Sequence, residues 1–269
     1  YMKMLYKYPQ VEYPYAQLVE ENRLRGREAP EFELVDVLRD VFKEGRYFDL
    51  FVEYAKAGQE DILCRLTAIN RGPEPAPIHV LPHLWYRNTW SWGYGRPRPR
   101  IRAWETHSAH TVDRHLGERW WYVEAKGTLT GHRPLLLFTE NETNNQRLFG
   151  TANVGRYVKD GINDAVVMSD AAAVNPEQTG TKAAPHFHLI LESGQSETLD
   201  LRLTTTAPQA LNTTYPSKVN PFGTHFETII QTRYEEADAF YAALTPDRLS
   251  EDAGHVMRQA LAGMLWTKQ

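Results

Sequence analysis

Two carboxylates in the segment FTENETN (Phe138 to Asn144) have the residue type and spacing for acid–base chemistry. Glu140 and Glu142 are two residues apart, so in an extended chain both would point to the same side, and Asp160 follows in a nearby polar stretch. Inverting hydrolysis of a glycosidic bond needs a carboxylic acid and a carboxylate about 6.5 to 9.5 Å apart. Two other interpretations stay open. The segment could be a polar loop whose side chains bind backbone groups, or a loop that reaches the rim of an active site in a neighbouring domain.

The densest aromatic cluster is the strip from Trp85 to Tyr94, which includes Trp90 and Trp92 beside Arg87 and Asn88. Sugars offer C–H faces that stack on indole rings, while arginine and asparagine supply directed hydrogen bonds. The strip therefore favours contact with carbohydrate, and packing at a domain interface is the alternative. We interpret the following Arg96-Pro-Arg-Pro-Arg100 run as an extended, solvated loop.

Histidine and cysteine give weaker signals. His186 and His188 are separated by one residue, which is how some β-sandwiches present metal ligands, but no acidic third ligand has suitable spacing. We therefore interpret them as structural residues. The single cysteine, Cys64, cannot form an internal disulfide, and its place in an alternating run predicts a buried thiol. Phosphate-binding loops, GxSxG elbows and paired CxxC motifs are absent from the sequence, so we expect no metal and no cofactor.

Composition limits the classes of partner. The 269 residues are 42% hydrophobic and 24% charged, which is enough for a full core. A net charge of -4 and the absence of a long basic run argue against nucleic acid as a partner. No stretch has the roughly 18 to 20 uninterrupted apolar residues of a membrane helix, so we expect no membrane partner.

Most of the chain has the pattern of an antiparallel β-sandwich. A short helix is predicted over 15–25, ending at Gly26. Alternation from Arg46 and from Asp61 predicts two strands that form a hairpin around Ala57-Gly-Gln-Glu60. Further strands are predicted at Ile78–Trp85, Trp120–Lys126, Leu135–Thr139, Ala165–Met168, His186–Leu191 and Thr198–Thr206. Proline, glycine and asparagine clusters separate these strands, as in a sandwich with long loops.

The last fifth of the chain is predicted to be helical. Thr224 and Glu227 fit a capping box at the start of a helix, and Pro246 ends that helix. A second amphipathic pattern runs from Val256 to Gln269 without a terminating glycine, asparagine or proline. We expect the chain to be cut at both ends, with a missing partner for this apolar face.

Eight strings of residues resemble bacterial proteins related to glycoside hydrolase family 63. They are YMKMLYKYPQ (1–10), RYFDLFVEYAK (46–56), HLWYRNTWSWG (83–93), FTENETN (138–144), YVKDGIN (157–163), GTKAA (180–184), EADAFYAAL (236–244) and RQALAGMLWTKQ (258–269). That family includes processing α-glucosidases and mannosylglycerate hydrolase-like enzymes. The resemblance covers nearly the whole chain.

The resemblance implies an N-terminal super-β-sandwich that packs on a C-terminal α/α toroid, with the catalytic carboxylates in the toroid. Residues 1–222 would then form the sandwich, and 223–269 a helical linker and the first toroid helix. We expect the chain itself to be an inactive, cytoplasmic fragment of an inverting glycosidase, with no catalytic residue of its own. Its partners would be its own toroid and a carbohydrate substrate.

The residues expected at the sugar-facing or domain-facing edge are Arg87, Asn88, Trp90, Trp92, Glu140, Asn141, Lys159 and Asp160. Two other hypotheses remain: a stand-alone carbohydrate-binding sandwich, and a metal-dependent enzyme built on His186 and His188.

Overall fold

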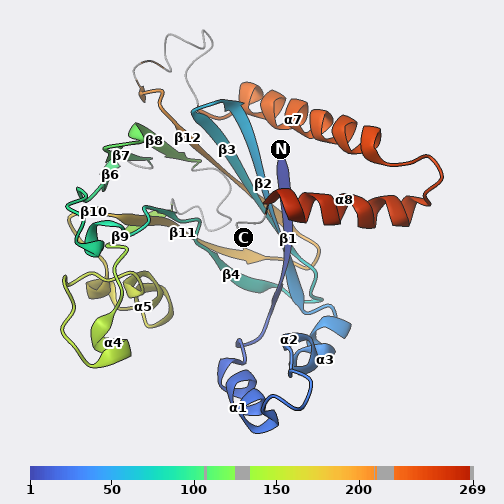
Figure 1. The fold of residues 1–269 in the computed structure, drawn as a ribbon, viewed down its shortest axis with the longest axis horizontal. Helices are drawn as coiled ribbons and strands as arrows, with labels where there is room; N and C mark the ends of the chain where they lie inside the picture. Colours follow the sequence, from blue (N-terminus) through green and yellow to red (C-terminus); the bar gives the residue numbers. More distant parts are fainter. Residues whose placement is uncertain (106–107, 125–133, 209, 211–220, 267–269) are drawn as a thin grey trace.

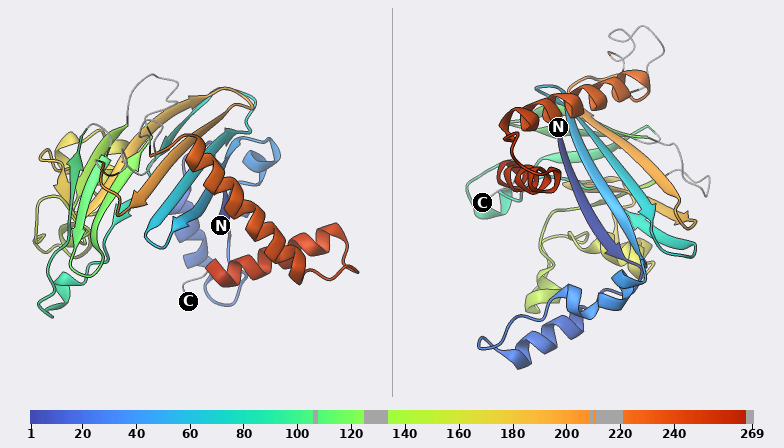
Figure 2. Two further views of the ribbon diagram at one scale, coloured as in Figure 1. Left: turned by 90° about the horizontal axis from the view of Figure 1, so that it is seen from above. Right: turned by 90° about the vertical axis from the view of Figure 1, so that its right-hand side faces the viewer.

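The protein is mainly an antiparallel β-sandwich with helices toward its C-terminus, as the sequence predicts. The computed structural model describes residues 1–105, 108–124, 134–208, 210 and 221–266. Two sheets form the layers, and the core lies between them (Figures 1 and 2).

The larger sheet joins strands from most of the chain. Within the described residues it has eight strands in the order β1-β2-β3-β12-β8-β7-β6-β10, and all neighbouring pairs are antiparallel. The strands are β1 (Met2–Pro9), β2 (Tyr47–Gly58), β3 (Asp61–Asn70), β6 (Arg100–Trp104), β7 (Ser108–Asp113), β8 (Gly117–Val123), β10 (Thr179–Gly180) and β12 (Ser196–Thr204).

The smaller sheet is built around β11 (Lys182–Leu191). The first half of β11 pairs with β5 (Leu84–Trp85) and β9 (Leu135–Thr139), and its second half pairs with β4 (Ala76–Val80). Since β10 ends at Gly180 and β11 begins at Lys182, the chain passes from one sheet to the other at Thr181. Gly180 lies so close to the Thr139 backbone that a Cβ atom would collide with it, which explains the glycine.

Alternation along β12 and β11 separates the core from the outer faces. Leu199 and Leu201 of β12 meet Phe187, Leu189 and Leu191 of β11 in the main core, and all five are at most 2% exposed. Together with the matching residues of β2, β3 and β4, they make the inter-sheet packing the main source of hydrophobic stabilisation.

The alternate residues of β12 face outward and form ion pairs. The Arg65 guanidinium donates to both carboxylate oxygens of Asp200 at 2.8 Å and to Glu227. Arg202 is 1% exposed and donates to Asp61 at 2.8 and 2.5 Å. Charges buried on this face are therefore paired, as their desolvation requires.

Two long helices follow the sandwich. α7 (Thr224–Leu244) lies along the outer face of the larger sheet, where Phe226 and Ile230 pack on Ala55 and Leu63. The chain turns at Pro246 into α8 (Glu251–Trp266), and the two helices form a hairpin that projects from the sandwich (Figure 1). The helix begins where predicted, but the predicted capping box is wrong. Gly223 occupies the N-cap, no side chain caps it, and Glu227 binds Arg65 instead.

The shorter helices lie in the connections. α1 (Tyr15–Arg25) has no buried residue and projects from the sandwich together with α2 (Leu34–Val37) and α3 (Arg39–Lys43) (Figure 1). The other short helices are η1 (Trp90–Trp92), α4 (Asn145–Phe149), α5 (Gly161–Val167) and η2 (Ala171–Ala173). None of the described helices is long and apolar enough to cross a membrane.

Most predicted elements are confirmed, including the 15–25 helix, the hairpin and the last two helices. The strand predicted at Ile78–Trp85 is divided into β4 and β5. Of the strand predicted at Trp120–Lys126, the described part ends at Val123, and 125 and 126 lie outside the described residues.

The strand predicted at Ala165–Met168 is wrong, because most of that segment lies in α5. Ile162 and Val166 are one helical turn apart, and both pack on a small cluster with Leu137. Four observed strands were not predicted: β1, β6, β7 and β10.

Candidate functional site

The predicted edge residues come from three loops at one end of the sandwich. The loop after β9 is joined to the segment before α5 by two backbone hydrogen bonds, from Glu140 N to Tyr157 O and from Lys159 N to Glu142 O, both 2.9 Å. The third loop, between β5 and β6, carries η1 and the arginine–proline run. Backbone pairing thus fixes the position of Glu140 and Glu142 relative to Lys159.

Glu142 is the most buried carboxylate of this region. It is 5% exposed and accepts a hydrogen bond from Trp90 Nε1 at 3.0 Å and another from Arg98. Arg98 also approaches Glu140 Oε1, at 3.7 Å. The two glutamates therefore do face the same side, as their spacing predicts, and one guanidinium lies against both.

Asn141 and Thr181 attach this loop to the corner between the sheets. Thr181 Oγ1 donates to Glu140 Oε2 at 2.7 Å and accepts from the Asn141 backbone N–H at 2.7 Å. The Asn141 side chain donates to the carbonyl of Tyr86 at 2.8 Å. These contacts give Asn141 a positioning role between the aromatic strip and the Glu140 loop.

Asp160 lies in a separate ion pair behind this loop. It accepts from Arg147 Nη1 at 2.9 Å and from Asn144 Nδ2 at 3.1 Å. Burial by itself would raise the pKa of Asp160, but these two hydrogen bonds outweigh it and lower the pKa below its ordinary value. The carboxylate is therefore held ionised, which suits a structural ion pair better than a general acid.

The aromatic strip divides into an inward and an outward part. Trp90 points to Glu142, whereas Trp92 is 47% exposed and has the Arg87 guanidinium 5.1 Å from its ring centroid. Tyr94, at 74% exposed, meets Trp92 edge-to-face at 6.4 Å. Asn88 accepts a hydrogen bond from the Ser91 backbone N–H and so holds the turn. The outward part of the strip, Arg87, Trp92 and Tyr94, is an exposed aromatic and cationic surface of the kind that can contact a sugar ring.

The structure thus joins Trp90, Glu140 and Asn141 in one network, places Lys159 and Asp160 beside it, and leaves Arg87, Asn88 and Trp92 on the outer turn. Arg98 was missed, because the run that contains it was interpreted as a solvated loop.

The histidine pair lies elsewhere, on the outer face of the smaller sheet. His79 Nδ1 is 2.7 Å from His186 Nε2, and the His79 ring stacks on His188 with centroids 4.3 Å apart. Desolvation, followed by His188, lowers the pKa of His79. Within the ranges that the structure describes, no group of three or more His, Cys, Asp or Glu is arranged to hold a metal ion.

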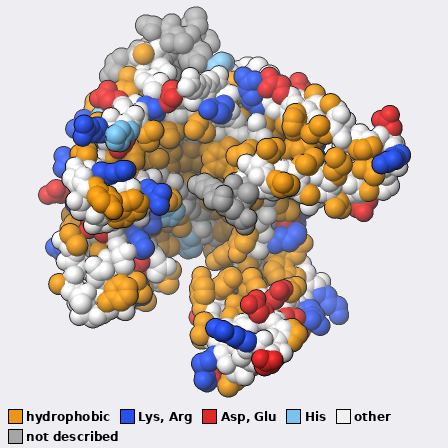
Figure 3. Space-filling view, in the orientation of Figure 1, with side chains coloured by type: hydrophobic (Ala, Val, Ile, Leu, Met, Phe, Trp, Pro, Cys, Tyr) orange, Lys and Arg blue, Asp and Glu red, His pale blue; other side chains and the backbone are white. Residues whose placement is uncertain are grey.

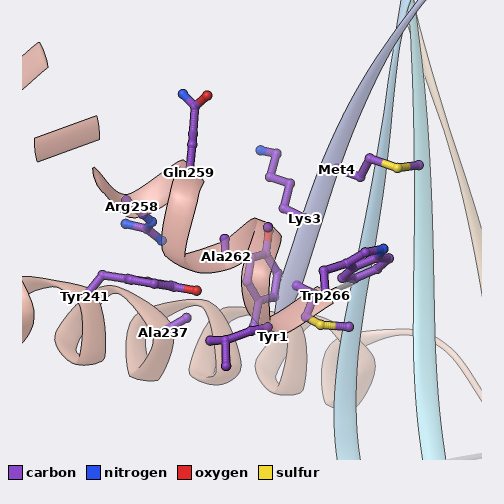
Figure 4. Close-up of a pocket in the computed structure, with 12 residues that line it drawn as sticks. Tyr1, Lys3, Met4, Ala237, Tyr241, Arg258, Gln259, Ala262 and Trp266 are labelled. Carbon is purple, nitrogen blue, oxygen red and sulfur yellow. The ribbon is translucent and has the colours of Figure 1, made fainter. Parts of the chain in front are cut away.

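A second candidate surface is the groove between β1 and the α7–α8 hairpin. It has a volume of about 370 Å³, and Figure 4 shows Tyr1, Tyr241 and Trp266 around it. Apolar side chains remain exposed along this part of the molecule: Met2, Met4, Phe240, Leu244, Val256, Met264 and Leu265. Figure 3 shows hydrophobic side chains gathered over the hairpin. We call these seven side chains together with the groove the apolar hairpin surface.

Comparison with known proteins gives one sequence relative. The chain is 32% identical over 297 aligned residues to an uncharacterized protein of Saccharomyces cerevisiae, and all of the chain is aligned. The chain spans 27% of the length of that relative. No family model matches the chain.

Two solved structures are similar to parts of the chain. A polysaccharide lyase matches 58% of this chain and 20% of its own, with a TM-score of 0.33 and 12% sequence identity. A protein described as a kojibiose phosphorylase from human microbiome matches 81% of this chain and 21% of its own, with a TM-score of 0.27 and 10% identity.

Proposed function

We propose that this chain is the β-sandwich region of a carbohydrate-active enzyme, a glycoside hydrolase similar to family 63 that acts on α-glucosides or related oligosaccharides. In this proposal residues 1–222 form the supporting domain, and 223–269 form a helical linker and the first helix of a catalytic α/α toroid. The sequence resemblance also favours a cytoplasmic enzyme.

The observation that carries the proposal is the apolar hairpin surface. Met264 and Leu265 are 75% and 68% exposed, and they lie beside the groove lined by Met2 and Met4 of β1. Contiguous apolar surface of this kind is typical of a face that packs on another domain. A supporting region needs such a face, whereas a module that acts alone does not.

The polar loops support a non-catalytic role. Glu140 and Glu142 share Arg98, and Asp160 is paired with Arg147. A general acid needs a proton near neutral pH, and a general base needs access to water. The ion pairs instead give these carboxylates a role in holding the loops together, so we place the catalytic acid and base in the toroid.

The outward aromatic surface would be the contribution of this region to the active-site rim. Trp92, Tyr94 and Arg87 are held on the turn around η1, and Trp90 anchors that turn to Glu142. In the proposed enzyme they face either the sugar or the toroid.

The first test is hydrolysis of aryl α-glucosides and α-linked disaccharides by this chain, beside a longer polypeptide that continues through the next helical domain. We expect turnover only in the longer polypeptide. Its Glu142→Gln variant should keep a substantial part of the activity, because the residue positions a loop and transfers no proton. Turnover by the chain alone, abolished in that variant, would show that the carboxylates of this region are the catalysts.

A paired variant tests the docking surface. Met264→Asp with Leu265→Asp should greatly reduce turnover of the longer polypeptide, since charges would be buried at the domain interface. Val154→Asp is the control, because Val154 is 78% exposed on the loop between α4 and α5. Equal turnover in both variants would contradict docking through α8.

The exposed pair Trp92 and Tyr94 also favours a second candidate, a stand-alone carbohydrate-binding module. This candidate predicts saturable binding of α-linked oligosaccharides by the chain alone, lost in Trp92→Ala, together with no hydrolysis by any longer polypeptide. Calorimetric titration separates the two, because the supporting-region proposal needs no binding by the isolated sandwich.

A further inference from the structure

A basic hollow lies on the outer side of the smaller sheet, apart from the apolar hairpin surface. It has a volume of about 430 Å³ and is lined from β4, β11, α5 and the end of β1. This volume is enough for a small organic molecule. The polar side chains that matter for its chemistry are Lys159, Lys182, His79, His83 and Asn163.

Two lysines give the hollow its charge. Lys182 Nζ donates to the backbone carbonyl of Lys159 at 3.0 Å, so the two residues lie side by side at the wall. The residues that line the hollow include no aspartate or glutamate. Asp160 is not part of the lining but acts on Lys182 through its charge, and its Oδ2 accepts hydrogen bonds from Arg147 and Asn144.

The surroundings of Lys182 disfavour its charged form. Burial, followed by the neighbouring charge of Lys159, lowers the pKa of Lys182. Desolvation, followed by the charge of Lys182, lowers the pKa of His83 to about 4, so His83 is neutral at pH 7 and offers a hydrogen bond without adding charge. An anion placed between the lysines would offset the repulsion between their positive charges.

Part of the lining is apolar. Ile162, Val166 and Val167 of α5 contribute to it, together with Leu81. A ligand that fits both the polar and the apolar lining has an anionic head and a short hydrocarbon part, because a fully polar ion would leave the apolar side chains uncovered.

We propose that this hollow binds a small organic anion, with its carboxylate or phosphate group between Lys159 and Lys182 and its hydrocarbon part against α5. The donors of His79, His83 and Asn163 would orient the head group. The inference does not depend on the glycosidase proposal, since the hollow lies within the sandwich.

The test is calorimetric titration of the chain at pH 7 and constant ionic strength, with inorganic phosphate and butyrate as separate probes. We expect saturable binding of at least one of them, and a loss of affinity of about tenfold or more in Lys182→Met. Lys43→Met is the matched control, because Lys43 is exposed at the end of α3, and it should bind as the unaltered chain does.

A second variant separates a loss of binding from a loss of fold. Lys159 is exposed, and its backbone carbonyl is the group that holds Lys182, so Lys159→Met should keep the fold and still weaken binding. Binding of butyrate alone would assign organic carboxylates, and binding of phosphate would assign phosphorylated ligands. No saturable binding of either probe, or unchanged binding in both lysine variants, would overturn the proposal.

Discussion

At the scale of single residues, the outer face of the larger sheet depends on one buried arginine. Arg202 is 1% exposed, donates to both oxygens of Asp61 and also donates to the carbonyl of Pro221 at 2.9 Å. It therefore ties the central strand β12 to the start of β3 and to the segment that leads into α7.

Arg202→Met should reduce the free energy of unfolding by about 3 to 5 kcal/mol, because Asp61 would lose its charged partner within the folded chain. Urea denaturation measures the change. Arg39→Met is the control: Arg39 is paired with Asp36 at the surface, and such pairs contribute about 1 kcal/mol or less. A similar small loss in both variants would refute the role assigned to Arg202.

The burial of Cys64 predicts how stability depends on pH. Desolvation raises the pKa of the Cys64 thiol from 9.0 to about 12, against the opposing effect of its hydrogen bond with Tyr54. Since the folded pKa is raised, the contribution of the thiol to stability is complete below pH 9 and is lost as the pH rises toward 12.

At pH 9 the folded chain should therefore react with a thiol reagent more than about tenfold slower than the chain in urea, because only the thiolate is nucleophilic. Following the reaction by absorbance under both conditions checks this. Equal rates would mean that Cys64 is accessible in the folded state and ionises normally.

At the scale of elements, α7 contacts the sandwich along its first half. Phe226 and Ile230 pack on the larger sheet, Arg233 donates to the carbonyl of Lys56, and Tyr234 meets Tyr1 edge-to-face. Phe226 is fully buried against Leu63 and Ala55, whereas Phe240, fourteen residues later in the same helix, is 51% exposed. The first turns are therefore part of the sandwich fold, and the last turns belong to the projecting hairpin.

Phe226→Ala should cost about 3 to 5 kcal/mol of unfolding free energy, as expected for a buried phenylalanine that leaves a cavity. Phe240→Ala, the same change on an exposed turn, should cost about 0.5 kcal/mol or less. Urea denaturation compares them directly. A larger loss of unfolding free energy in Phe240→Ala than in Phe226→Ala would show that the end of α7 is packed more firmly than its beginning.

The sequence predicts those strands in which apolar and polar residues alternate. The β2–β3 hairpin and β12 show this alternation, and all three have one face in the main core. β1 was not predicted, although Met2, Met4, Tyr6 and Tyr8 alternate with Lys3 and Lys7. Seven of its eight residues are exposed, and the strand is defined by its pairing with β2. β7 was missed because its buried residues include Ser108, His110 and Thr111, which are polar.

The candidate site was predicted in part for a similar reason. Residue type identified Trp90 and Glu140, but Arg98 and Thr181, the partners of Glu140, are far from it in the sequence, and no local pattern brings them together. The exchange of sheets places Thr181 beside Glu140, and that is a property of the topology.

At the scale of the whole molecule, the order of strands in the larger sheet sets when the protein can fold. β12 lies between β3 and β8, although 125 residues separate the end of β3 at Asn70 from the start of β12 at Ser196. On the ribosome, β2–β3 and β6–β8 can each pair locally, but they remain two separate pieces with unpaired edges until Ser196–Thr204 has emerged. Long-range strand pairing forms slowly, so the nascent chain has unpaired edges at β3 and β8 until β12 pairs with both. Unpaired strand edges promote aggregation, and these two edges are therefore the ones that a chaperone would need to protect.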